Sequence, residues 1–397
     1  MTARFAAAVL ALLVASLPGA AGEWETSGSA DLELRWFFHD PRFPGQLEDG
    51  QGSVVLSPEF DWESEERRHQ ISVAPFLRLD GRDDERTHFD IREAYWRRIW
   101  DEWEFVAGVN TVFWGVTESR HLVNVINQTD AVEDIDEEDW LGQPMLHVAT
   151  QRNWGRIEAF ALLGFRERTF PGRDGRLRTP LIVATDDAVY ESGAREWRLD
   201  GALRYSHYIG DWDIGAHGFH GTGREPSLVP SPGGGSLIPF YEVTNQLGVD
   251  VQYTREAWLW KLEAIGREGQ GDTFGAAVGG FEYTFYQIGG GAADIGLLAE
   301  YLYDGRDDTA PATAFDDDVF VGSRLALNDL QDTQVLAGAI VDRHDRSIAA
   351  FIEAERRIGS NYKIELESRW FLNTDDQNPL ATFNRDSFLT LRISRHF

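Results

Sequence analysis

The chain has 397 residues, a formal charge of −29, 39 glycines, 14 tryptophans and no cysteine. This acidic balance argues against nucleic acid and anionic headgroups as direct partners, because like charges repel. The lack of cysteine excludes disulfides, thiolate metal ligands and a thiol nucleophile. The length alone suggests two or three soluble domains, but no linker, composition break or helical period separates them, so a single large barrel is expected.

The N-terminal segment, residues 1–22, is predicted to be an export signal. Arg4 precedes an apolar run, residues 5–17, and small residues follow up to the expected cleavage point. The run has thirteen residues, fewer than the roughly 18 to 20 that a spanning helix needs. The alternative is a retained N-terminal anchor. No later segment is apolar for long enough to span as a helix, so residues 23–397 are expected to enter a membrane only as strands.

Most of the remaining chain alternates between polar and apolar residues over short runs that end in turn signals. In one such run, Tyr362, Ile364 and Leu366 alternate with charged residues. A soluble β-sandwich also alternates, but here the polar faces carry charges of both signs at mid-strand, and the apolar faces begin or end in Trp and Tyr, as interfacial girdles do. The predicted strands are 24–38, 52–64, 67–80, 86–99, 102–113, 144–153, 156–168, 195–208, 211–221, 241–254, 257–267, 273–286, 292–304, 317–328, 331–341, 346–358, 361–373 and 386–397.

The connections between the predicted strands alternate in length. Tight links are expected at Glu65-Glu66, Trp100-Asp101, Trp154-Gly155, Gly210, Arg255-Glu256, Asp329-Leu330 and Gly359-Ser360. Longer links are expected at 39–51, 114–143, 169–194, 222–240, 305–316 and 374–385. Short periplasmic turns and long extracellular loops are typical of outer-membrane barrels. The predicted fold is all-β, a single antiparallel transmembrane β-barrel of about 18 strands, with 16 as the alternative, around an aqueous lumen.

The last predicted strand has one apolar face and one polar face. Leu389, Leu391 and Ile393 fall on one side, and Thr390 lies between them on the other. The chain finishes on Phe397. Together with the export signal, this pattern looks like the closing strand of a bacterial outer-membrane barrel, and it predicts contact with the barrel-assembly machinery.

The longest connection, residues 114–143, is predicted to fold into the barrel as a constriction. Between Glu118 and Asp139 it has eight acids and one arginine, yet it also contains an apolar cluster within 122–126 that an open loop does not need. Acids in a narrow lumen bias which ions pass. The alternative is that they face open water or bind divalent cations at the lipopolysaccharide layer; the D-x-D-x-E spacing lacks the glycine and terminal Glu of an EF-hand. The predicted constriction residues are Trp114, Gly115, Glu118, Asn127, Asp130, Glu133, Asp134, Asp136, Glu137, Glu138 and Asp139.

Two segments, residues 106–115 and 126–130, resemble a pattern of porin-like Gram-negative families. In that pattern a strand with a central glycine runs into Trp-Gly, and an Asn-Pro-x-Asp-like element follows. The outer-membrane family DUF1302 and the alginate-export family are the nearest. The resemblance implies a strand-to-loop corner at Trp114-Gly115 and a loop element at Asn127 and Asp130. This chain has Gln128 in place of the proline and is shorter than typical DUF1302 members, so the resemblance implies a porin-like barrel and no particular substrate.

Basic side chains are predicted to line the lumen, interleaved with acids such as Glu33, Glu263 and Glu300. They are expected to form a basic wall that faces the acidic loop and gives a transverse field. The alternative is Arg–Glu pairing across neighbouring strands, which stiffens the wall without selectivity. The predicted inward basic residues are Arg35, Arg78, Arg198, Arg204, Lys261, Arg324, Lys363, Arg369 and Arg392.

Few residues of the sequence are candidates for enzymatic catalysis. Ser206-His207 and His217 with His220 are the suggestive groupings, but adjacent strand residues point to opposite faces, and the two histidines of the second grouping differ in parity. No HExxH, GxSxG, P-loop or dinucleotide fingerprint occurs. The protein is therefore predicted not to be an enzyme and to use no cofactor or metal.

The predicted function is passive diffusion or export of small polar or charged solutes through a porin-like channel in the outer membrane of a Gram-negative bacterium. The alternatives are a plugged structural or adhesive surface barrel and a barrel enzyme. Expected partners are outer-membrane lipid, lipopolysaccharide, the barrel-assembly machinery and a small solute, with no nucleic acid. The sequence does not predict the solute, the ion selectivity or the oligomeric state.

Overall fold

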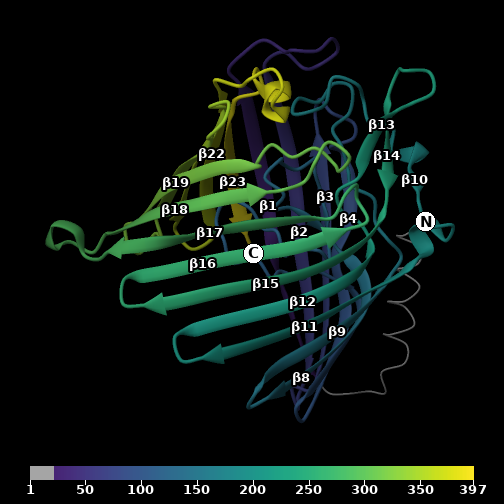
Figure 1. Cartoon of the computed structure of the whole chain (residues 1–397). Helices are drawn as coiled ribbons and strands as arrows, with labels where there is room; N and C mark the ends of the chain where they lie inside the picture. The colour runs from purple at the N-terminus through teal and green to yellow at the C-terminus, as the bar shows by residue number, and fades with distance from the viewer. Residues whose placement is uncertain (1–21) are drawn as a thin grey trace.

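A computed structural model describes residues 22–397 and shows one antiparallel sheet of eighteen strands (Figure 1). All but the last residue of the predicted export signal lies outside the described residues. The strands are β1 (Gly22–Phe37), β2 (Gly50–Ser64), β3 (His69–Asp80), β4 (His88–Trp100), β5 (Trp103–Asn110), β8 (Gln143–Arg152), β9 (Gly155–Leu163), β11 (Leu199–Ile209), β12 (Trp212–Thr222), β15 (Val243–Arg255), β16 (Trp258–Glu268), β17 (Phe274–Phe285), β18 (Asp294–Asp304), β19 (Asp317–Ala326), β20 (Gln334–Asp342), β21 (Ile348–Ile358), β22 (Tyr362–Leu372) and β23 (Phe388–His396). The predicted all-β fold and its eighteen strands are confirmed.

The sheet closes into a barrel because its first and last strands pair. Each of the eighteen strands is hydrogen-bonded to the next one along the chain. The last strand, β23, pairs with β1, and Leu34 lies opposite Leu391. Closure leaves no free strand edge, which is the arrangement that satisfies every backbone donor and acceptor in a membrane. Residues 22–397 contain no helix that is long and apolar enough to cross a membrane.

The two faces of the strands differ as the alternation predicts. On β16 and β18, Trp260, Leu262 and Leu297 are exposed on the outer surface. Their neighbours Glu263 and Glu300 are buried on the inner side. An apolar outer surface around a charged interior is the pattern of a barrel whose outer wall contacts hydrocarbon.

The two rims have connections of different length. One rim, here the short-turn rim, has mostly tight links such as 101–102 and 210–211, and the opposite long-loop rim has long ones such as 164–198. Two links on the short-turn rim differ most from the prediction: 327–333 replaces the expected two-residue turn at Asp329-Leu330, and 286–293 contains η3 (Ile288–Gly290).

The long-loop rim contains short strands and 3₁₀ helices where the sequence predicted irregular loops. Two of these loops form a three-stranded sheet of β10 (Val189–Tyr190), β14 (Leu237–Tyr241) and β13 (Ser227–Pro230). Figure 1 shows this sheet standing at one side of the barrel. The 3₁₀ helices η1 (Thr185–Asp187), η2 (Arg195–Trp197) and η4 (Pro379–Phe383) belong to the same rim.

Candidate functional site: a loop inside the barrel

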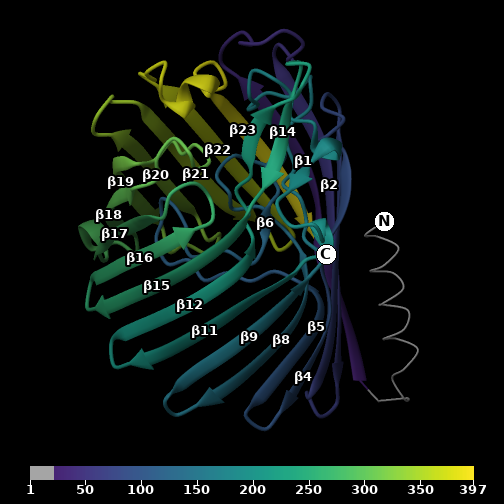
Figure 2. The same cartoon turned by 45° about the vertical axis from the view of Figure 1, so that its right-hand side comes forward.

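The connection between β5 and β8, residues 111–142, turns into the barrel. Its two short strands, β6 (Gln128–Thr129) and β7 (Trp140–Leu141), pair with each other. Figure 2 shows β6 inside the ring of barrel strands. Many loop side chains are buried, including Val123 and Asp130, both with no exposed surface. Most of this segment is therefore packed against the inner wall, whereas residues 137–139 are exposed.

The loop begins at a tight corner formed by Trp114 and Gly115. The Trp114 ring is buried, and the Arg204 guanidinium lies 4.9 Å from the centre of a Trp114 ring. A Cβ atom on Gly115 would lie 2.4 Å from Nδ1 of His121, so only glycine fits at this approach. The backbone N–H groups of Trp114 and Gly115 both donate to Oδ1 of Asn124, at 2.8 and 3.1 Å. The corner is thus fixed by packing and by one side-chain acceptor.

Asn127 holds the two ends of the loop together. Its Oδ1 accepts from the backbone N–H of Val112 at 2.8 Å, and its Nδ2 donates to the carbonyl oxygens of Asn110 and Leu141 at 3.0 and 2.9 Å. An asparagine supplies both an acceptor and two donors, so one side chain satisfies three backbone groups.

The apolar half of the loop fills one side of the lumen. Leu122, Val123, Val125 and Ile126 are buried in one cluster with inward-facing residues of the strands β8 to β20. Phe160, Phe219 and Phe320 are the largest partners on the wall. Burial of this apolar surface, at about 25 cal/mol per Å², is the main attraction between the loop and this side of the barrel.

Two buried carboxylates on the wall bind the turn at residues 116–119. Glu263 Oε1 accepts from the backbone N–H of Val116 and Thr117 at 2.7 and 3.1 Å and from the Thr117 hydroxyl at 2.7 Å. Its Oε2 accepts from the N–H of Val123 at 3.1 Å. Glu300 binds the next two backbone N–H groups, those of residues 118 and 119, both at 2.8 Å. Charge-assisted bonds of this kind are about twice as strong as neutral ones.

The acidic half of the loop is held by ion pairs with the wall. Most of the loop acids contact an arginine or lysine of a barrel strand directly. The pairs are Glu118 with Lys261 at 3.2 Å and Arg324 at 2.7 Å, Asp130 with Arg92 at 2.6 Å, Glu133 with Arg78, Asp134 with Arg35 at 2.9 Å, and Asp136 with Arg369 at 2.5 Å. Five of the nine basic residues predicted to line the lumen therefore bind this loop.

The other four predicted basic residues pair with acids on the wall. Arg392 binds Glu33 at 2.8 Å, Arg204 binds Asp250 at 2.7 Å, Lys363 binds Glu355 at 2.7 Å and Glu365 at 2.8 Å, and Arg198 binds Asp200. Arg198 was expected inside a strand, but it directly precedes β11 at the long-loop rim. The sequence left two alternatives open, a basic wall that faces the acidic loop with a transverse field and Arg–Glu pairing across neighbouring strands. In the structure five of the basic residues form ion pairs with the loop and four with acids of the wall.

Two cavities lie on opposite sides of loop residues 133–139. The outer cavity, about 650 Å³, is lined by long-loop-rim segments such as 308–315 and by Ile135, Asp136 and Glu137. The inner cavity, about 440 Å³, is lined by Glu133, Asp134, Asp136, Glu138 and Asp139 and by β20 to β23. Asp136 lines both cavities. The segment 133–139 is thus the partition between them.

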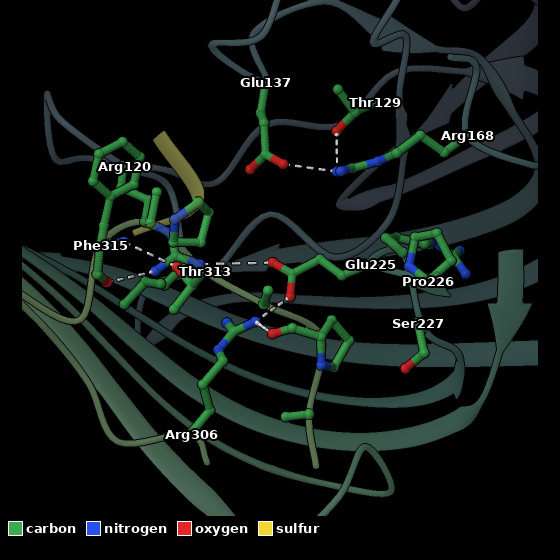
Figure 3. A pocket seen from close by; sticks show the side chains of 18 of the residues that line it. Arg120, Thr129, Glu137, Arg168, Glu225, Pro226, Ser227, Arg306, Thr313 and Phe315 are labelled. Atoms are coloured by element: carbon green, nitrogen blue, oxygen red, sulfur yellow. Dashed lines mark hydrogen bonds and ion pairs between the residues drawn. The ribbon is translucent and has the colours of Figure 1, made fainter. Parts of the chain in front are cut away.

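Charges of both signs balance around the outer cavity, which has five arginines and four carboxylates. Figure 3 shows Glu225 beside Arg306 and Arg120, with Arg168 facing Glu137 across the cavity. Glu225 lies 2.9 Å from Arg306 and 3.7 Å from Arg120, and Arg168 lies 2.7 Å from Glu137. Glu225 and Glu137 already have arginine partners, and the five arginines and four carboxylates leave this cavity with little excess charge.

The inner cavity is acidic, because nine carboxylates and four guanidinium groups line it. Glu138 and Asp139 are exposed to the lumen and make no ion pair within residues 22–397. Enclosure in the barrel, together with Asp136 and Glu353, raises the pKa of Glu138 to about 7. The same cause, with Glu133 and Asp136, raises the pKa of Asp139 to about 7. These two carboxylates are the least neutralised acids of the loop.

Several residues that hold the loop were not among the predicted site residues. Arg86 donates to the carbonyl oxygens of Val132 and Glu133 at 2.9 and 3.3 Å, and Arg92 binds Asp130. Neither arginine was predicted to line the lumen. Glu263 and Glu300 were recognised as inward acids, but their contacts with loop backbone were not foreseen. A buried carboxylate that faces unpaired N–H groups leaves no pattern in the sequence, whereas the position of Arg92 on an inward face of β4 could have been read from the alternation.

The residues suspected of enzymatic chemistry are not brought together. Ser206 and His207 lie on opposite faces of β11, and His217 is buried on the inner side of β12 while His220 is exposed. His217 Nε2 lies 3.1 Å from the amide nitrogen of Gln246, and His220 Nδ1 lies 2.6 Å from Asn245. Neither grouping pairs a hydroxyl nucleophile with a base.

Solved structures with the same architecture are outer-membrane barrels. Wzi from Escherichia coli, described as an outer-membrane protein involved in group 1 capsule assembly and a carbohydrate-binding β-barrel, superimposes with a TM-score of 0.55 at 10% identity, covering 92% of this chain and 83% of its own. A BenF-like porin from Pseudomonas fluorescens superimposes with a TM-score of 0.53 at 9% identity, covering 94% and 98%. The chain has the fold of a porin-like outer-membrane β-barrel.

The comparisons go no further than the fold. No protein-family model matches the sequence, and no curated protein matches it either. The porin-like resemblance predicted from the sequence is confirmed at the level of the barrel. The likeness to the DUF1302 and alginate-export families stays a prediction.

Proposed function

We propose that this barrel is a porin-like channel for passive diffusion of small polar or charged solutes across the outer membrane of a Gram-negative bacterium. The observation that supports this most is the pair of polar cavities on either side of residues 133–139 inside a closed barrel. A solute would pass from the outer cavity to the inner one at Asp136, which lines both. In this proposal residues 114–143 are the constriction.

The proposal includes an orientation and a set of partners. The short-turn rim faces the periplasm and the long-loop rim faces outward, as in other barrels of this class. The outer wall contacts lipid and, at the long-loop rim, lipopolysaccharide, and β23 with Phe397 is the segment that the barrel-assembly machinery would recognise. The resemblance of segments 106–115 and 126–130 to the DUF1302 and alginate-export families supports a porin-like barrel and favours no particular solute.

The constriction is proposed to favour cations. The basic wall is neutralised by the loop acids and by neighbouring strands, so it does not present a free positive field. The remaining excess of charge is negative and lies in the inner cavity, where Glu138 and Asp139 have no cationic partner within the described chain. A ring of unpaired carboxylates concentrates cations at a narrow point.

Neutralising these two acids is expected to lower the preference for cations. A charge about 8 Å from a permeating ion changes the energy of that ion by about 0.5 kcal/mol in water, and salt screens part of this. The double variant Glu138→Gln/Asp139→Asn should therefore lower the potassium-to-chloride permeability ratio by about two- to fivefold. The measurement is the reversal potential in a salt gradient at pH 8. Glu65→Gln, a change on the short-turn rim outside both cavities, is the control, and an unchanged ratio in the double variant contradicts the constriction.

The same preference is expected to depend on pH. Because the pKa values of Glu138 and Asp139 are raised to about 7, both groups are mostly neutral below that pH and mostly charged above it. The permeability ratio of the native protein should rise by about twofold or more between pH about 6 and pH about 8. The double variant should lose most of this rise. A ratio that changes equally in both proteins would show that other groups titrate.

The proposed function itself is tested by planar-bilayer recording on purified, refolded protein. Stepwise conductance increases are expected as single barrels insert. A second candidate, a plugged surface barrel that binds or displays carbohydrate, is favoured by the apolar half of the loop, which fills one side of the lumen. Silent native protein whose Glu263→Ala variant conducts would support this second candidate and contradict the first.

A further inference from the structure

Three aspartates gather at the long-loop rim, away from the loop inside the barrel. Asp316 ends the connection between β18 and β19, Asp318 is the second residue of β19, and Asp342 is the last of β20. Asp318 and Asp342 are direct partners in the register of the two strands. One carboxylate oxygen from each of the three lies within 4.8 Å of the others.

The two strand aspartates face the inside of the barrel. Asp318 has the same parity as Phe320, and Asp342 the same parity as Ile340, and both of these apolar residues are buried. Asp318 is 1% exposed and Asp342 is 4% exposed. Asp316 is exposed at the rim, so the cluster has two buried carboxylates and one that is open to solvent.

Asp318 has a buried oxygen without a partner. Its Oδ2 accepts no hydrogen bond from any residue in 22–397. Asp342 Oδ1 accepts from the backbone N–H of His344 and Asp345 at 2.6 and 2.8 Å, and its Oδ2 is 3.4 Å from Nδ2 of Asn378. One Asp318 carboxylate oxygen lies within 4.8 Å of an oxygen of each of the other two aspartates. A buried, unsatisfied carboxylate oxygen costs several kcal/mol unless something binds it.

No basic side chain of the described chain pairs with this cluster. Arg343 is next to Asp342 in sequence but pairs with Asp317 at 2.7 Å, and Asp317 has the opposite parity to Asp318. Elsewhere inside the barrel such acids are neutralised; Asp304, for example, binds both Arg120 and Arg306. Like charges directly opposite each other in a sheet are destabilising, so a bound cation would stabilise this arrangement.

His88, Asp130 and Glu133 form a second group with metal-ligand spacing. In this group, unlike the three aspartates, the acids pair with basic side chains. Arg92 binds Asp130 at 2.6 Å, and Arg78 binds Glu133. The arginines already supply the positive charge there. Of these two groups, the three-aspartate cluster is therefore the one whose carboxylates have no positively charged partner in the described chain.

We propose that Asp316, Asp318 and Asp342 bind one calcium ion at the outer mouth of the barrel. Three carboxylates supply hard oxygen ligands, and Ca²⁺ accepts six to eight oxygens in flexible geometry, so water completes the shell. The ion would link the connection 305–316 to the end of β20. Because Asn378 contacts Asp342 and Asp345, the ion would also stabilise the connection 373–387, which lines part of the outer cavity.

The test uses full-length protein refolded in detergent without lipopolysaccharide and treated with EDTA. Calorimetric titration with CaCl₂ is expected to show one site per chain, and Asp318→Asn should weaken it about tenfold or more. Asp317→Asn is the matched control, since this neighbour faces away from the cluster, and it should bind Ca²⁺ as the native protein does. Equal binding by both variants, or no binding by native protein, overturns the proposal.

Thermal unfolding gives a second readout that does not depend on the titration. Without Ca²⁺, Asp318→Asn should raise the unfolding temperature, because it removes one of the opposed charges. Addition of CaCl₂ should raise the unfolding temperature of the native protein and leave that of Asp318→Asn unchanged. If CaCl₂ raises both equally, the ion acts elsewhere and the assignment fails. If MgCl₂ matches CaCl₂ at equal concentration, the assignment to calcium fails.

Discussion

Replacing Glu263 by alanine is expected to release the first half of the inner loop from the barrel wall. The Glu263 carboxylate is fully buried and accepts three backbone N–H groups and one hydroxyl from loop residues 116–123. Alanine leaves these donors buried without a partner. At about 1 kcal/mol for each of these four hydrogen bonds, the loop should lose about 4 kcal/mol of binding, which is about a thousandfold in the ratio of released to packed loop.

Two measurements check the release. Trypsin should cut the variant at Arg120, which is mostly buried in the native loop, and the cleavage rate should rise with the population of released loop. Single-channel conductance should rise severalfold, because an 18-stranded barrel without its inner loop has a wide aqueous lumen. Glu263→Gln keeps one acceptor and should be intermediate.

The matched control for this prediction is Glu268→Ala on the same strand. Glu268 accepts from Nδ2 of Asn245 at 2.9 Å on the exposed side of the wall and does not contact the loop. It should leave both the proteolysis pattern and the conductance at native values. If Glu263→Ala behaves like this control, the buried carboxylate does not hold the loop, and apolar packing alone must do so.

The barrel strands could be predicted from the sequence because the alternation of polar and apolar residues is a local pattern. A strand between hydrocarbon and water must alternate, and the run predicted at 361–373 corresponds to β22 (Tyr362–Leu372) within one residue at each end. Turn residues then set the strand count. The prediction was weaker where the chain leaves the wall: the predicted strand 195–208 begins late, at Leu199, because η2 occupies its first residues.

The long-loop rim was not readable in the same way. The three-stranded sheet of β10, β13 and β14 combines segments that are about 50 residues apart, and its strands are too short to give a period. Loop lengths indicated where these segments lie but not that they pair. Such contacts depend on closure of the barrel, which brings distant loops to one rim.

The inner loop shows why the site was only partly predictable. Its composition indicated two parts, an apolar cluster and a run of acids, and the structure places them against different sides of the wall. The partner of each acid was not predictable, because Arg35 and Asp134 are 99 positions apart and meet only when the barrel is closed. Composition therefore predicted the kind of interaction, and the register of the closed barrel decides which residues make it.

Replacing Arg78 by methionine is expected to lower the stability of the whole barrel. Arg78 is 1% exposed and binds Glu33 on β1 and Glu133 in the loop, each through two hydrogen bonds. Methionine leaves Glu133 with only His88 beside it, at 3.6 Å. Breaking a buried ion pair by removing one partner typically costs about 3 to 5 kcal/mol, since the other charge is left unpaired.

Equilibrium unfolding in urea, in the presence of lipid vesicles, measures this loss. The matched control is Arg97→Met on the neighbouring strand β4, whose pair with Glu104 is 3.7 Å long and partly exposed and should contribute about 0 to 1 kcal/mol. The double variant Arg78→Met/Glu133→Leu should recover part of the stability, because it removes the stranded carboxylate and leaves Glu33 with Arg86 and Arg392. Equal losses in the single and double variants would show that Arg78 acts through Glu33 alone, and the loop would then not contribute to the stability of the barrel through this pair.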